Sequence, residues 1–90
     1  MSAQDLAIKY IAAMENTLES VKRLSVTVSE ESLDDVFNYV KAYLKDAKYF
    51  LKQGKFETSL VSIAYSEGLL DALKLVGAVS VSPADKTSIV

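Results

Sequence analysis

Three stretches of this 90-residue chain repeat their apolar residues every three to four positions, which is the period of an α-helix. We expect helices over residues 4–24, 32–53 and 56–77, each about 30 Å long. The intervening connections each reverse the chain, so the pattern predicts an all-α fold, a three-helix up-down-up antiparallel bundle. The bundle domain should occupy residues 1–77. Residues 78–90, which contain Pro83 and show no helical period, should form a mobile C-terminal tail.

The first two helices each show one apolar stripe. Ser29 or Ser32 can cap the second helix, and Gly54 can end it in the left-handed conformation. So short a link to the third helix makes an antiparallel helical hairpin. The core stripe of the second helix, widened along one edge by Tyr39, Tyr43 and Phe50, consists of Leu33, Val36, Phe37, Val40, Leu44, Ala47 and Leu51.

The third helix is apolar almost all round. Its two apolar sides are separated by a narrow serine stripe. A helix without a wide polar face is either central in its fold or shared with a partner. We therefore expect a protein contact through this helix, such as a homodimer. The residues are Phe56, Leu60, Ile63 and Leu70 on one side, Val61, Tyr65, Leu69, Ala72 and Val76 on the other, and Ser59, Ser62 and Ser66 between them.

The composition excludes several chemistries. Cys and His are both absent, which removes disulfides, thiolate or imidazole metal ligands, and the commonest general base. The three glycines are scattered, so no phosphate-binding loop is present. We expect no cofactor, and no catalytic constellation is recognisable; only an enzyme based on carboxylates, lysine or hydroxyl groups is left open. Charges within residues 59–79 and the lack of a signal peptide favour a cytoplasmic protein without a membrane span.

Two acids one turn apart, Glu67 and Asp71, interrupt the third helix around Gly68. Like charges at this spacing repel, so something should compensate them. One interpretation is a hydrogen-bonded network with Tyr39 or Tyr43 that fixes the register of the hairpin; the other is a weak divalent-cation site. Gly68 should mark a close approach, inside the bundle or across a dimer. The candidate polar site comprises Tyr39, Tyr43, Asp46, Tyr65, Glu67 and Asp71.

A ridge of lysines follows one side of the second helix. Such a ridge, with one exposed aromatic ring, could bind RNA or another anion. The alternative is an ordinary solvated helix face, and the net charge of −2 does not favour nucleic acid. The ridge consists of Lys41, Lys45, Lys48, Tyr49, Lys52 and Lys55.

Two segments of the hairpin, YVKAYLKDAKYFLKQGK (39–55) and IAYSEGLLDALKLVG (63–77), resemble the short archaeal proteins of domain-of-unknown-function family 357. The resemblance implies a left-handed three-helix bundle in an archaeal cytoplasm and assigns no activity. Similar segments joined to cytidylyltransferase-like domains would imply an accessory module. Lys55 departs from the family pattern, in which the residue after the glycine is often acidic, and this weakens the start of the third helix.

These observations favour an interaction or scaffold module that self-associates through the third helix. A Mg²⁺-dependent nucleotide-binding or nucleotide-hydrolysing accessory protein is the alternative from a different class. Weak RNA binding by the lysines of the second helix is a third.

Overall fold

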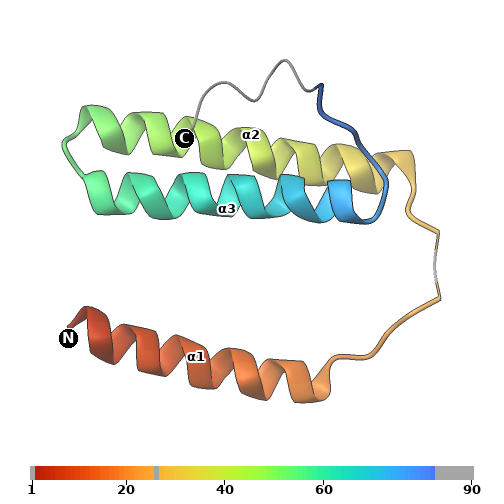
Figure 1. Ribbon diagram of the computed structural model, residues 1–90. Helices are drawn as coiled ribbons and strands as arrows, with labels where there is room; N and C mark the ends of the chain where they lie inside the picture. Colours follow the sequence, from red (N-terminus) through yellow and green to blue (C-terminus); the bar gives the residue numbers. More distant parts are fainter. Residues whose placement is uncertain (1, 26, 83–90) are drawn as a thin grey trace.

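The computed structural model describes residues 2–25 and 27–82. They form three helices in up-down-up order, α1 (Ala3–Ser20), α2 (Glu30–Lys52) and α3 (Phe56–Leu75) (Figure 1). No strand occurs within those ranges, so the predicted all-α, three-helix fold class is confirmed. Most of the tail predicted for residues 78–90, namely 83–90, lies outside the described residues.

The α2–α3 hairpin is closed by a glycine turn. Gly54 has φ +74°, the left-handed conformation expected of it. Its N–H donates to the carbonyl of Leu51 at 3.1 Å, while the N–H of Lys55 donates to Phe50 at 2.9 Å. These two bonds cap the carbonyl end of α2. Gly77, with φ +78°, ends α3 in the same way.

The serine stripe of α3 faces α2. Ser59 donates its hydroxyl to the carbonyl of Ala47 at 2.7 Å, and Ser66 donates to that of Val40 at 2.8 Å. Ala47 and Ser66 are 6% and 5% exposed, and their small side chains let the two helices approach closely. Together with Leu73, at 7%, they are the buried residues of the described chain, so the core of the hairpin alone is small.

The helix ends follow local capping chemistry. Ser2 accepts from the N–H of Asp5 and the Asp5 carboxylate accepts from the N–H of Ser2, a reciprocal cap that starts α1. Ser29 caps α2, whereas no side chain caps α3 at Lys55, as its sequence predicts. α1 ends at Ser20, four residues before the predicted end, where the Ser20 hydroxyl bonds back to a backbone carbonyl and no glycine follows.

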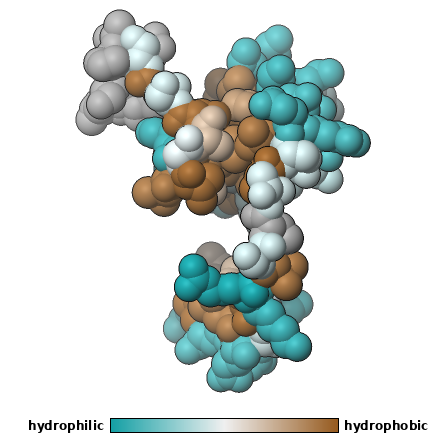
Figure 2. All heavy atoms as spheres, turned by 90° about the vertical axis from the view of Figure 1, so that its right-hand side faces the viewer, coloured by the Kyte–Doolittle hydropathy of each residue, from teal (hydrophilic) through white to brown (hydrophobic). Residues whose placement is uncertain are grey.

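α1 stands apart from the hairpin. Packing between helices in the described residues joins α2 with α3, while α1 contacts neither of them. Figures 1 and 2 show α1 as a separate body joined to the hairpin through the linker 21–29. The apolar stripe of α1 is therefore uncovered: Tyr10, Ile11, Met14 and Leu18 are each about 60% exposed. Three helices form in this order, and the structure leaves one interface of the bundle open.

Candidate interaction surface

The hairpin has an apolar face on each side. Because α3 turns its serine stripe toward α2, the two apolar sides of α3 lie on opposite faces, each continued by a flank of α2. We call them the leucine face and the tyrosine face. The leucine face comprises Phe37, Leu44, Leu51, Phe56, Leu60, Ile63 and Leu70; the tyrosine face comprises Tyr39, Tyr43, Val61, Tyr65 and Leu69.

Three tyrosines of the candidate polar site meet on the tyrosine face. The rings of Tyr39 and Tyr43 are stacked with centroids 6.4 Å apart, and those of Tyr43 and Tyr65 with centroids 5.2 Å apart. Tyr39 and Tyr65 are nevertheless 61% and 59% exposed. A row of stacked, half-uncovered rings offers a large rigid contact area with polar hydroxyl tips, the kind of surface that is enriched in protein interfaces.

The acids of the candidate polar site do not join these tyrosines. Glu67 is exposed on the side of α3 that carries the leucine face, because it follows Ser66, which points at α2. Asp71 forms an exposed ion pair with Lys74 at 3.8 Å, and Asp46 is exposed. Within residues 2–25 and 27–82, no hydrogen bond links Glu67 to a tyrosine, and no cluster of three acidic side chains could hold a metal ion.

The contacts that fix the hairpin register are the serine hydroxyl bonds. Sequence reasoning placed Ser59 and Ser66 on a smooth surface without assigning them partners. Their separation of seven residues was the available signal, since seven residues make two helical turns and put both hydroxyls on one face.

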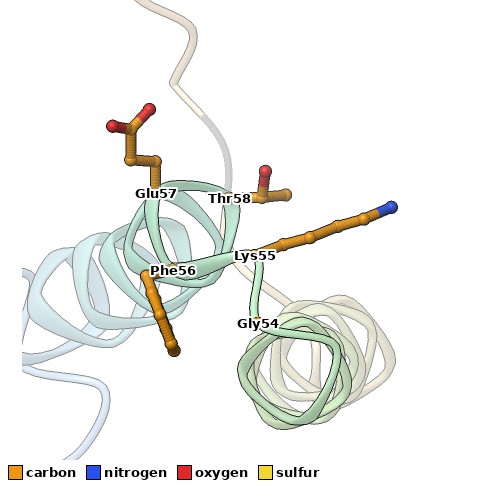
Figure 3. A pocket seen from close by; sticks show the side chains of 5 residues that line it. All are labelled: Gly54, Lys55, Phe56, Glu57 and Thr58. Atoms are coloured by element: carbon orange, nitrogen blue, oxygen red, sulfur yellow. The ribbon is translucent and has the colours of Figure 1, made fainter.

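The leucine face begins beside the turn. Figure 3 shows the shallow hollow lined by residues 54–58, with Phe56 and Glu57 projecting to opposite sides of α3. Phe56 and Leu60 are 63% and 66% exposed, and Leu44 of α2 is 40% exposed. This face is built from aliphatic and phenylalanine side chains, which have no polar group that could hydrogen-bond to water. Such a face is more stable when another part of a protein covers it permanently.

Gly68 has open space around it. A Cβ atom built there would meet no atom within 4 Å outside the neighbouring backbone. The close approach expected at this glycine therefore does not occur inside the hairpin. With Ala64 and Ala72, one turn before and after it, Gly68 gives α3 a smooth edge beside Tyr65, and a hollow lined by Val61, Ala64 and Tyr65 lies next to it.

The lysines of the predicted ridge are exposed, and those on α2 lie beside the leucine face. Tyr49 is 57% exposed and packs edge-on against Phe50, with centroids 5.3 Å apart. No described helix is both long and apolar enough to cross a lipid bilayer. The exposed lysines of the ridge form a basic border along the α2 edge of the leucine face.

Comparisons with known proteins identify a family. No curated protein and no solved structure matches the chain. The model of a family described as protein of unknown function (DUF357) matches residues 9–79, which include most of α1, the linker and the whole hairpin. With the greater part of its length matched, the chain belongs to the DUF357 family.

Proposed function

We propose that this chain is a protein-interaction module that self-associates through α3. The observation that carries the proposal is that α3 leaves apolar side chains uncovered on both faces of the hairpin. Phe56 and Leu60 are exposed on one face, and Val61 and Tyr65 on the other, each by more than half. The proposal includes the cytoplasmic, archaeal setting that the family resemblance implies.

The two apolar faces of the hairpin favour a contact with a second protein chain. One amphipathic helix such as α1 can cover one face of a helical hairpin, because its own apolar stripe is one-sided. The hairpin has two faces, so one of them needs a cover from outside a single chain. The tyrosine face suits this role, since tyrosine tolerates both exposure and burial. The open edge at Gly68 also lets another helix approach.

The two other functions find less support in the described residues. A Mg²⁺ site needs carboxylates that converge, and Glu67, Asp71 and Asp46 are exposed and form no group of three acids that could hold a metal ion in the described residues. RNA binding on the ridge is not favoured by the net charge of −2, and Tyr49, the one aromatic ring of the ridge, already contacts Phe50 edge-on. Neither function accounts for the apolar area on α3.

Light scattering over a concentration series tests the proposal. The wild-type chain should form a dimer or higher assembly at high micromolar concentration. Tyr65→Glu should weaken the association by about 30-fold, as expected for the loss of a buried aromatic anchor. Tyr49→Glu is the matched control, because Tyr49 is equally exposed but lies off the tyrosine face. A wild-type chain that stays monomeric would refute self-association; equal effects of both substitutions would refute this surface.

A further inference from the structure

The leucine face and the stripe of α1 are two uncovered apolar surfaces in one chain. We propose that they cover each other between two copies: the α1 helix of one copy packs on the leucine face of the other, and the reverse. This inference goes beyond the proposed function, because it assigns a cover to the face opposite the tyrosine face. The partner is a second copy of this chain.

The linker is the first observation. Residues 21–29 contain no glycine, which would supply the left-handed conformation of a tight turn, whereas the α2–α3 connection turns at Gly54. The backbone is extended at both described ends, with ψ 133° at Val21 and ψ 160° at Ser29. A segment of nine residues can span at most about 30 Å, while packed helices lie about 8–10 Å apart. In the described residues α1 contacts neither helix of its own hairpin, and a linker of this reach lets it contact the hairpin of another copy.

Charge is the second observation. In helical projection, Glu15 and Glu19 lie along one flank of the α1 stripe, while Lys9 lies on the side of the helix that faces away from the stripe. The leucine face has exposed lysines, Lys41 and Lys48, along its α2 border and exposed acids, Glu67 and Asp71, along its α3 border.

These charges choose a direction for α1. A right-handed helix laid on the leucine face parallel to α3 turns Glu15 and Glu19 toward Lys41 and Lys48. The reverse direction brings the acids of α1 beside those of α3. On the tyrosine face, the parallel direction leaves Glu15 and Glu19 beside the uncharged edge at Gly68. Charge complementarity therefore favours the leucine face and the parallel direction.

The contact is large enough for a dimer. α1 has 18 residues, against 20 in α3, so it matches the length of the face. A helix of this length is about 27 Å long and at least 10 Å wide, so two such contacts, with both sides counted, cover on the order of 1,100 Å². A specific interface needs about 1,000 Å². The exchange supplies this area because it makes the same contact twice.

Cysteine cross-linking tests the exchange without background, since the chain has no Cys. Two differently tagged chains are refolded together, one with Ala7→Cys in α1 and the other with Leu60→Cys on the leucine face, because the parallel arrangement places these two residues level with each other. A short bismaleimide should join them into a heterodimer. Val61→Cys replaces Leu60→Cys in the control, because the two neighbours are 56% and 66% exposed but lie on opposite faces. The control yield should be at least tenfold lower.

A single chain with both Ala7→Cys and Leu60→Cys supplies the second readout. Cross-linked dimers support the exchange. A product cross-linked only within one chain means that α1 covers its own hairpin and overturns it, and so does the absence of any cross-link. The measurements are repeated with Tyr65→Glu, which should weaken association through the tyrosine face and leave the cross-linked dimer intact. Failure of the exchange and failure of the proposed function thus give different results.

Discussion

Gly68→Ala tests whether any other part of the same chain packs against Gly68. Gly68 lies in the interior of α3, where glycine costs about 1 kcal/mol relative to alanine. A Cβ atom at this position meets nothing within 4 Å in the hairpin. The substitution should therefore stabilise the chain by about 1 kcal/mol, which raises the melting temperature of a domain of this size by about 4–8 °C.

The assay is urea and thermal unfolding, followed by circular dichroism at a concentration where light scattering finds a single species. Ala64→Gly, one turn earlier on the same edge of α3, is the calibrating control and should cost about the same amount. At high concentration, the same methyl group should weaken association through the tyrosine face. Destabilisation of the dilute chain by Gly68→Ala would refute the reasoning, because it would mean that another part of the chain packs against this glycine.

Three further predictions concern the hairpin. Ser66→Ala should destabilise it by about 1 kcal/mol in urea unfolding, because the buried hydroxyl loses its bond to Val40; an unchanged midpoint would mean that the bond adds nothing. Lys55→Asp should raise the thermal midpoint by supplying the side-chain cap that α3 lacks, worth about 1 kcal/mol, and Lys55→Ala separates the cap from the loss of charge. Millimolar Mg²⁺ should leave the midpoint unchanged, since the exposed Glu67 and Asp71 form no metal cluster in the described residues; a rise would reinstate the cation site.

Local chemistry made most of the fold predictable. Apolar periodicity found all three helices, and the requirement for a left-handed residue placed the ends of α2 and α3 at Gly54 and Gly77. The early end of α1 at Ser20 was missed because a serine hydroxyl competes with the backbone, a preference that periodicity does not register.

The site was less predictable, because it depends on which side of α3 faces α2. Apolar residues occur on both sides of this helix, so hydrophobicity alone did not show which side faces α2. The serine hydroxyls set the orientation of α3, since Ser59 and Ser66 donate hydrogen bonds to α2 carbonyls. That orientation brings Tyr43 and Tyr65 together and carries Glu67 away from the tyrosines. The position of α1 depends on a linker without glycine, which periodicity does not describe.

The small core of the hairpin has a consequence for how stability is set. Ala47, Ser66 and Leu73 contribute little apolar area, and the large side chains around them are half covered. If a second copy supplies the cover, unfolding separates two chains, and the equilibrium follows mass action. Each tenfold dilution then lowers the free energy of unfolding of the dimer by about 1.4 kcal/mol. The amount of this protein in the cell would thereby determine how much of it stays folded, and a weakly expressed chain would be cleared by proteases before it could act.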